Sequence, residues 1–350
     1  MDELRLMDEA LRLAAPTSPH PNPRVGAIVL DRDGRVVASA AHAGAGAPHA
    51  EAVALAAAGP AAVGGTLVVT LEPCAHEGRT PPCTRAIVAA GIRRVVIGAE
   101  DPDRRVGGRG IAALREAGIE VALHPDGRAA EAVDPGYFHH RRTGLPRVTL
   151  KAALTLDGQA AAADGTARWI TDGPAREDGH RLRAAADAVM VGAGTLIADD
   201  PVLTVRTPGY QGRQPRPVLV AGERSLPPGA AIWRRDPIVL APAPLEVPGG
   251  EVVVVPGEHG VDLRRGVAAL GEREIVDLLV EGGPALAGAM LRAGLVQRGV
   301  FYLAGRLAGG TGRPAFGGSF ATLADARDVA ITGVEPVGGG VRIEFALEEV

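Results

Sequence analysis

Short apolar runs and amphipathic segments alternate along the first part of the chain. Helical spacing of apolar residues over 2–15 precedes two apolar runs, 25–30 and 36–40, separated by the polar turn 31–34. Further alternation predicts a helix over 49–58, a strand over 66–71, a helix over 83–90, a strand over 95–98, a helix over 111–117 and a strand over 119–123. This order is typical of an α/β domain, in which helices cover a sheet.

The periodicity breaks at residues 141–146, which read Arg-Arg-Thr-Gly-Leu-Pro and predict a linker. The pattern then restarts. Strands are expected over 148–154, 188–191, 218–220, 238–240, 252–255, 275–280 and 300–303, and helices over 174–184 and 284–293. Surface loops are expected over 207–217, 227–230 and 242–250. Two domains are the natural expectation for a chain of 350 residues. We therefore predict two α/β domains, residues 1–145 and 146–350.

Composition narrows the classes of protein. Hydrophobic residues make up 46% of the chain, enough for buried cores, and aromatic residues only 3%. A net charge of -4 with mixed signs argues against a nucleic-acid-binding surface. No apolar run approaches the roughly 18 residues of a membrane span, and no leader-like segment opens the chain. We expect a cytoplasmic protein that binds neither membrane nor nucleic acid.

Four residues of the first half form the pattern of a zinc hydrolase. The chain has two cysteines, Cys74 and Cys83, downstream of a His49-Ala-Glu51 triplet. One imidazole and two thiolates leave the fourth zinc position open for water. Zinc lowers the pKa of that water, and a glutamate carries the proton in the H-x-E…P-C-x-x-C pattern of nucleobase deaminases. We predict His49, Cys74 and Cys83 as zinc ligands and Glu51 as general base.

The two cysteines allow three other interpretations: a disulfide, two unrelated buried thiols, or a structural zinc site. The expected reducing compartment disfavours a disulfide. A structural zinc site would need a fourth cysteine or histidine, and only His76 is near enough in sequence to supply it.

Two residue types occur once each, Lys151 and Asn22. Arginine is the cation everywhere else, so a retained lysine indicates a site that a guanidinium cannot serve, unless its position is a compositional accident. Asn22 lies between Pro21 and Pro23 and offers a donor and an acceptor to a pyrimidine or ribose. The alternative for Asn22 is a simple turn asparagine.

The motifs of both halves resemble those of the bifunctional deaminase–reductase family of riboflavin biosynthesis. The matching stretches are His20-Pro-Asn-Pro-Arg-Val-Gly26, His49-Ala-Glu51, Thr70-Leu-Glu-Pro-Cys74, Gly78-Arg-Thr-Pro-Pro-Cys83, Lys151 with Leu156-Asp-Gly158, Trp169-Ile-Thr171, Leu196-Ile-Ala-Asp-Asp-Pro201, Leu203-Thr-Val-Arg206 and Glu281-Gly-Gly-Pro284. The resemblance implies a cytidine-deaminase-like three-layer α/β/α domain followed by a dihydrofolate-reductase-like α/β domain. It also implies a homo-oligomer, zinc and NADPH as cofactors, and phosphoribosyl pyrimidines as substrates.

In the deaminase half, the family's chemistry is hydrolytic loss of an amino group from 2,5-diamino-6-(5-phosphoribosylamino)pyrimidin-4-one. The eight residues between the cysteines must form a loop beside the metal, which would bring His76 and Arg79 to the substrate. A guanidinium suits a phosphate, although a solvated surface position is the commoner fate of an arginine. The resemblance adds His42 and Asn22 as substrate-binding residues.

In the reductase half, the family uses NADPH to reduce the ribosyl chain of 5-amino-6-(5-phosphoribosylamino)uracil to ribityl. The chain lacks G-x-G-x-x-G, but the Gly-Gly turn after strand 275–280 would let a pyrophosphate approach a helix N-terminus. The resemblance implies Lys151 and Asp199 as catalytic residues. It implies Arg183, Leu203, Arg206 and Glu281 as substrate-binding residues, and Ala153, Trp169, Thr195, Asp199, Gly282, Gly283, Pro284, Ala285, Leu286 and Ala287 as cofactor-binding residues.

Two positions depart from the family pattern. Ala167 stands where a hydroxyl residue is common, and Glu77 where a second histidine is common.

Three rival functions make different predictions. A polynucleotide deaminase needs a basic or aromatic groove, which the composition does not offer. A deaminase of free nucleosides would leave about 200 C-terminal residues unexplained. A non-catalytic zinc protein would bind metal without releasing ammonia.

Overall fold

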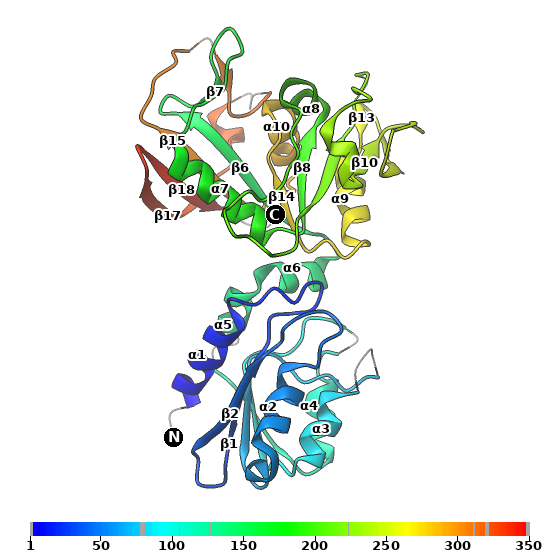
Figure 1. Cartoon of the computed structure of the whole chain (residues 1–350), viewed down its shortest axis with the longest axis vertical. Coiled ribbons are helices and arrows are strands. Elements are labelled where there is room, and N and C mark those ends of the chain that lie inside the picture. Colours follow the sequence, from blue (N-terminus) through cyan, green and yellow to red (C-terminus); the bar gives the residue numbers. More distant parts are fainter. Residues whose placement is uncertain are drawn as a thin grey trace. The chain divides into compact units, whose positions relative to one another are not determined.

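A computed structural model describes residues 3–77, 81–104, 106–125, 128–222, 224–310, 312–318 and 322–347. The chain divides into two compact units, Met1–Gly144 and Leu145–Val350. Each has its own main sheet, as Figure 1 shows, and its buried apolar side chains form clusters of their own. No helix within the described ranges has both the length and the hydropathy to cross a bilayer.

The first unit is built on a five-stranded sheet of order β2-β1-β3-β4-β5. The strands are β1 (Gly26–Leu30), β2 (Val36–Ala41), β3 (Thr66–Val69), β4 (Arg94–Ile97) and β5 (Glu120–Leu123). Strand β1 is antiparallel to β2 and β3, whereas β3, β4 and β5 run parallel. Every residue of β1 is buried because helices cover both faces of the sheet there.

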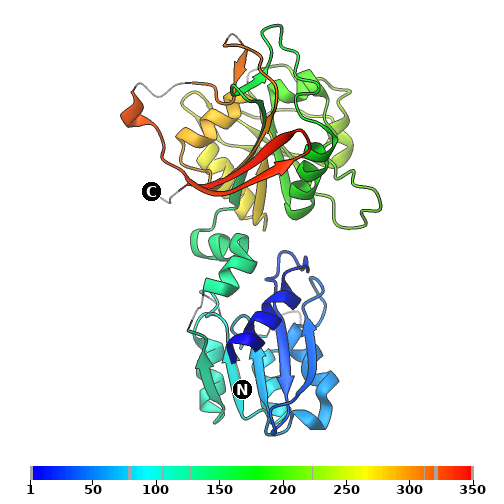
Figure 2. The same ribbon diagram turned by 90° about the vertical axis from the view of Figure 1, so that its left-hand side faces the viewer.

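Helices form a layer on each face of this sheet, as predicted for an α/β/α domain (Figures 1 and 2). One layer holds α1 (Glu3–Ala14) and α5 (Arg128–Val133), and the other α2 (Ala50–Ala58), α3 (Cys83–Ala89) and α4 (Arg109–Glu116). Apolar residues of α1 recur every three or four positions and are buried on one side: Leu6, Met7, Ala10, Leu11 and Ala14. Gly26 permits this packing, since a Cβ there would lie 2.0 Å from the carbonyl oxygen of Ala10.

The predicted linker over 141–146 is wrong in its first half, because α6 spans Pro135–Thr143. Three large side chains of α6 are buried, namely Tyr137, Phe138 and His140. The helix ends at Thr143, and Gly144 caps it with a φ of 76°, in the left-handed region typical of a helix C-terminus.

The second unit has a nine-stranded mixed sheet of order β11-β10-β9-β8-β14-β6-β15-β18-β17. Its strands are β6 (Arg147–Thr155), β8 (Ala188–Gly192), β9 (Arg216–Val220), β10 (Ile238–Ala241), β11 (Glu251–Val254), β14 (Asp277–Val280), β15 (Arg298–Ala304), β17 (Ala330–Val337) and β18 (Gly340–Ala346). The pairs from β11 to β15 are parallel, and β18 and β17 close the sheet antiparallel. Short pairs β7 (Gln159–Ala161) with β16 (Arg313–Pro314), and β12 (Pro256–Gly257) with β13 (Gly260–Val261), lie outside it.

Alternate residues of the parallel strands enter two separate cores. In β8, Ala188 and Met190 face one core, and Val189 and Val191 face the other. The first core contains residues of α9 (Leu263–Gly271) and α10 (Pro284–Arg292), and the second contains residues of α7 (Gly173–Ala185) and α8 (Ala193–Asp199). Burial on both faces explains why these strands appear in the sequence as continuous apolar runs.

Several elements of the second unit were not predicted. Helices α8 and α9 were missed, and so were the hairpin strands β17 and β18, which form one edge of the sheet (Figure 2). The predicted loop over 207–217 is wrong at its end, since Arg216 begins β9.

Candidate active sites

The predicted zinc ligands converge in the first unit. His49 immediately precedes α2 with extended backbone, Cys74 follows β3, and Cys83 is the first residue of α3. The Nδ1 atom of His49 lies 3.2 Å from the sulfur of Cys83 and 3.6 Å from that of Cys74. All three potential ligand atoms lie within 4.8 Å of one another. Both cysteines are free, which excludes the disulfide.

The chemistry of this donor set fits a zinc ion. The pKa of Cys74 is lowered, first because Cys83 donates a hydrogen bond to its sulfur, and also because His49 donates one. The pKa of Cys83 is raised for the reciprocal reason and by burial. The side chains of His49, Cys74 and Cys83 therefore share protons through hydrogen bonds, and a zinc ion that bound them would displace these protons. An imidazole and two thiolates match the ligands of catalytic zinc sites.

Glu51 lies in the first turn of α2, two residues after His49, and only 4% of its surface is exposed. Burial raises the pKa of Glu51, and the charge of His49 opposes this shift. A buried carboxylate beside the ligand cluster, with a raised pKa, is suited to accepting and returning a proton.

Asn22 and His42 lie beside the cluster. The Nδ1 atom of His42 is 3.2 Å from the carbonyl oxygen of Pro48, so Nδ1 carries the proton and donates it. The Nε2 atom then accepts a hydrogen bond from Nδ2 of Asn22, at 3.0 Å. The rings of His42 and His49 meet edge to face with centroids 5.3 Å apart. Burial lowers the pKa of His42, which favours the neutral ring that this chain of bonds requires.

The loop between the cysteines is described only in part. His76 is exposed there, and so is Glu77, whose side chain is 68% exposed and forms an ion pair with Arg85 of α3. Arg79 lies outside the described residues. Just before Cys74, Glu72 is buried and accepts hydrogen bonds from backbone N–H groups. The sequence did not reveal this role.

Asp101 follows β4 and is almost completely buried. Burial raises the pKa of Asp101 to about 6, and the charges of Asp103 and Glu72 add to the increase. Oδ1 of Asp101 accepts hydrogen bonds from the N–H of Asp103 at 2.8 Å and from the hydroxyl of Tyr137 at 3.1 Å. Both bonds lower the pKa of Asp101 and so oppose the increase. The folded state thus binds a proton more tightly than the unfolded chain, whose aspartates titrate near 4. The stability that Asp101 contributes is fully present below pH 4 and declines as the pH rises through about 6.

We expect Asp101→Asn to raise the free energy of unfolding of the first unit by about 1–3 kcal/mol near pH 7.5, and to lose this advantage below about pH 4. An amide oxygen can accept both hydrogen bonds, so the neutral side chain replaces the carboxyl group without its charge. Urea titrations followed by circular dichroism at the two pH values measure this. Tryptophan fluorescence serves as the control, because both tryptophans, Trp169 and Trp233, lie in the second unit. An equal gain at both pH values would contradict the prediction.

In the second unit, Arg183 of α7 and Glu281 form a two-point ion pair. The guanidinium donates to both carboxylate oxygens, at 2.6 and 3.0 Å, and also to the carbonyl oxygen of Thr204 at 2.9 Å. Burial alone would raise the pKa of Glu281, but the charges of Arg183 and Lys151 lower it on balance. The ammonium of Lys151 lies 5.8 Å from the ring centre of Tyr302. Lys151, Arg183 and Glu281 therefore form one charged group at the sheet.

Two helix N-termini meet next to this group. Strands β8 and β14 are neighbours, and α8 and α10 follow them after Gly192 and Gly283. The N–H of Gly283 donates to Oγ1 of Thr195 at 3.1 Å, which joins the two turns. Leu286 and Ala287 are buried, so α10 offers its first-turn N–H groups here rather than these side chains.

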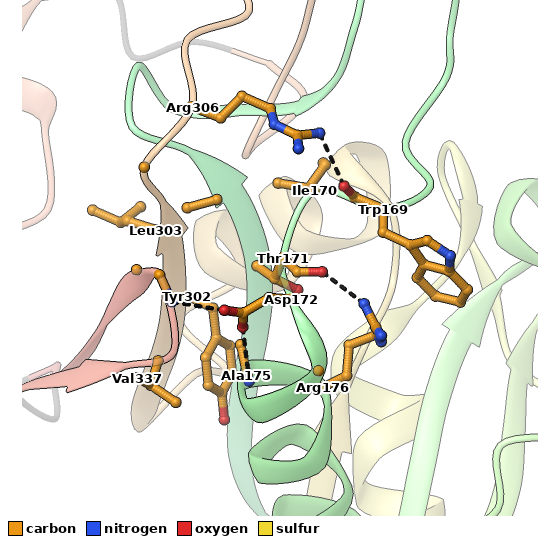
Figure 3. Close-up of a pocket in the computed structure, with 15 residues that line it drawn as sticks. Trp169, Ile170, Thr171, Asp172, Ala175, Arg176, Tyr302, Leu303, Arg306 and Val337 are labelled. Carbon is orange, nitrogen blue, oxygen red and sulfur yellow. Dashed lines mark hydrogen bonds between the residues drawn. The ribbon is translucent and has the colours of Figure 1, made fainter.

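Trp169 lies between two cavities and is 61% exposed. The first, of about 330 Å³, reaches Tyr302 and the hairpin residues Val337 and Gly339 (Figure 3). Figure 3 shows the indole pointing away from Tyr302, and the guanidinium of Arg176 lies 4.5 Å from its ring centre. The carbonyl oxygen of Trp169 accepts a hydrogen bond from Arg306 at 3.1 Å.

The second cavity, of about 360 Å³, lies between Trp169 and Arg206. His180 of α7 also lines it and accepts a hydrogen bond from the backbone N–H of Arg206 at 3.4 Å. Sequence reasoning missed His180. Its spacing of three residues from Arg183 on a predicted helix would have placed the two on one face.

The remaining predicted residues of the reductase half differ in what they expose. The side chain of Leu203 is buried in the core and its φ of 57° is left-handed, so only its backbone is available to a ligand. Asp199 ends α8 and forms an ion pair with Arg168 at 3.2 Å. Ala153 lies on β6, opposite Tyr302 of β15.

The fold and the two sites together define a bifunctional enzyme, a zinc-dependent deaminase joined to a reductase. Residues 1–99 match the model of the cytidine and deoxycytidylate deaminase zinc-binding region, and residues 146–341 match that of the RibD C-terminal domain.

Relatives extend this assignment over nearly the whole chain. The riboflavin biosynthesis protein RibD of Mycobacterium tuberculosis is 40% identical over 324 residues, covering 89% of this chain and 88% of the relative. The RibD protein of Escherichia coli K12 is 39% identical over 335 residues, which cover 89% of this chain and 90% of the relative. A solved structure of Acinetobacter baumannii RibD is 33% identical with a TM-score of 0.91, covering 99% of both chains. The protein belongs to the RibD family.

The predicted fold class, family, activity and two cofactors are thereby confirmed. The protein is a bifunctional deaminase and reductase of riboflavin biosynthesis, with a zinc-binding deaminase domain and an NADPH-dependent reductase domain. A further solved structure, from Thermotoga maritima, is described as a diaminohydroxyphosphoribosylaminopyrimidine deaminase/5-amino-6-(5-phosphoribosylamino)uracil reductase. It is 30% identical with a TM-score of 0.86, covering 99% of this chain and 98% of that one.

Proposed function

We propose that His49, Cys74 and Cys83 hold the zinc ion and that Glu51 is the proton carrier of the deaminase. The observation that supports this most directly is the convergence of the three ligand atoms within 4.8 Å. Glu51 and the Asn22–His42 pair lie beside them.

The substrate of this site is 2,5-diamino-6-(5-phosphoribosylamino)pyrimidin-4-one, in line with the description of the Thermotoga maritima relative. When bound, zinc supplies a water acidified for attack on the amino-bearing ring carbon. Glu51 would accept a proton at its buried carboxylate and return it to the departing ammonia. Asn22 and His42 orient the pyrimidine, and His76 and Arg79 contact the remainder of the substrate.

In the reductase, NADPH supplies the hydride that converts the ribosyl chain of 5-amino-6-(5-phosphoribosylamino)uracil to ribityl. Thr195 and the turn from Gly282 to Ala287 bind the cofactor phosphates at two helix N-termini, supported by the bond between Thr195 and Gly283. Trp169, Ala153 and Asp199 complete the cofactor site.

The substrate of the reductase binds on the charged group of β6, α7 and β14. Lys151 donates the proton or holds the sugar, and Asp199 takes part in the proton transfer. Glu281 contacts the substrate, and Arg183 fixes Glu281 while keeping further N–H groups for a ligand. Arg206 lines the 360 Å³ cavity and binds the phosphate, and Leu203 contributes its backbone.

The deaminase function belongs to residues 1–145 and the reductase function to residues 146–350, supported by the division of the chain between Gly144 and Leu145.

The protein is cytoplasmic, which its two free thiols favour. It forms a homo-oligomer, supported by Ile331 and Val334, which are 65% and 59% exposed on the edge strand β17.

The test supplies the diamino pyrimidine substrate and NADPH to the whole chain and follows ammonia and NADPH together. Ammonia release should precede NADPH oxidation and match it mole for mole, and metal analysis should find one zinc ion per chain. NADPH oxidation without ammonia release would contradict the order of the two reactions. Ammonia release by protein free of zinc would contradict the metal site.

A further inference from the structure

Glu72 lies two residues before the zinc ligand Cys74, and its carboxylate is hydrogen-bonded to backbone N–H groups outside the ligand cluster. Both of its carboxylate oxygens are used by backbone N–H groups. Oε1 accepts from Gly110 at 2.8 Å and Ile111 at 3.1 Å, and Oε2 accepts from Gly108 at 3.0 Å and Asp101 at 3.2 Å. The side chain is 4% exposed. A carboxylate with four such donors is committed to the backbone around it.

Three of these donors belong to the N-terminus of α4. Gly108 is the residue before the helix, and Gly110 and Ile111 are in its first turn, where N–H groups have no partner within the helix. The negative charge of Glu72 also interacts favourably with the helix dipole. Glu72 thereby ties the segment that leads to Cys74 to the first turn of α4.

The next residue, Pro73, is held by packing. Gly110 has no side chain, and a Cβ at this position would lie 1.9 Å from the carbonyl oxygen of Pro73. The helix therefore touches the backbone between Glu72 and Cys74 directly. Beyond Cys74, the N–H of Thr84 donates to its carbonyl oxygen at 3.2 Å, and the N–H of Cys83 lies 3.4 Å from its sulfur. Cys74 is fixed on both sides by the starts of two helices.

We infer that Glu72 is a positioning residue of the metal centre, which sets the place of the Cys74 sulfur through α4. The inference rests on the proposed zinc site and adds a residue to it that touches neither metal nor substrate. A glutamine would keep the shape of the side chain. However, its NH₂ group would face N–H donors in place of one oxygen, so two of the four contacts would be lost.

The experiment compares wild type with Glu72→Gln in the full chain. Zinc affinity is measured by competition with a chromophoric chelator, and the geometry of the site by the visible and near-ultraviolet spectrum of the Co²⁺-loaded protein. We expect Glu72→Gln to bind zinc about 10- to 100-fold more weakly, the range for residues that orient metal ligands, and to show an altered thiolate–cobalt spectrum. Glu100→Gln is the matched control, since Glu100 is a neighbouring but exposed carboxylate, and it should behave as wild type.

A purely structural role would give a different result. Glu72→Gln would then be less stable to urea in its metal-free form but would keep the wild-type zinc affinity and cobalt spectrum, and this would overturn the inference. If Glu72→Gln fails to fold, Glu72→Asp decides by the same criteria, because it keeps the charge and withdraws the carboxylate by one CH₂ group. Wild-type protein that bound no zinc would overturn the metal site itself, which distinguishes the two failures.

Discussion

Replacing Glu51 with glutamine should leave one zinc ion bound per chain and lower the rate of ammonia release by about 10²–10⁴-fold, the range of general acid–base catalysis. Glu51 is buried beside the three ligand atoms, in the first turn of the helix that His49 precedes. Glutamine has almost the same shape, so the ligands stay in place, but its amide cannot accept a proton and return it.

The measurement is steady-state ammonia release together with metal analysis of the same sample. Glu77→Gln is the control within the zinc loop, because its exposed carboxylate pairs with Arg85 at the surface and should contribute little. NADPH oxidation by Glu51→Gln, supplied with the deaminated intermediate, should equal that of wild type. Ammonia release at the wild-type rate would remove Glu51 from the mechanism.

Replacing Lys151 with arginine should lower NADPH oxidation by about 10²–10³-fold and leave deamination unchanged. The ammonium of Lys151 lies over the ring of Tyr302 and contributes to the charge balance of Glu281. Gly179 of α7 lies beside the Lys151 side chain, since a Cβ there would be in ordinary van der Waals contact with Cε of Lys151, at 3.8 Å. The guanidinium of arginine is larger than the ammonium of Lys151, is planar and does not give up a proton at neutral pH. It therefore reproduces neither the shape nor the proton-donating role of the lysine.

The reductase reaction is followed as NADPH oxidation with the deaminated intermediate, at several substrate concentrations so that kcat and KM are separated. Arg181→Lys tests the reverse exchange on the exposed side of α7, where no effect is expected. Unchanged turnover by Lys151→Arg would show that the single lysine of the chain has no chemical role.

The sequence predicted those features that depend on local pattern. The central strands of both units are continuous apolar runs, and His49 and Cys83 stand at the starts of helices that the pattern located. Cys74 lies in the segment after the predicted strand β3. The edge hairpin was missed because most residues of β17 are exposed and no alternation marks it. Helix α6 was missed because its arginines resemble a linker, although Tyr137 and Phe138 bury its other side.

Contacts between distant residues could not be predicted in the same way. Arg183 and Glu281 are 98 residues apart, and Thr195 and Gly283 are 88 apart. Each pair meets only because β8 and β14 are neighbours in a sheet whose order the sequence does not state. Glu72 was recognised as part of a motif, but its four donors come from segments after β4 and at α4.

The carbonyl oxygen of Pro48 determines, through His42, how the amide of Asn22 is held beside the ligand cluster. Because it fixes the tautomer of His42, Nε2 of His42 accepts one N–H of the Asn22 amide, and His42 leaves the oxygen and the second N–H of that amide unused. Under the proposed role of Asn22, a ligand edge that carries a donor beside an acceptor would match this amide. A peptide carbonyl outside the ligand cluster thus sets the hydrogen-bonding pattern of a proposed substrate-binding side chain.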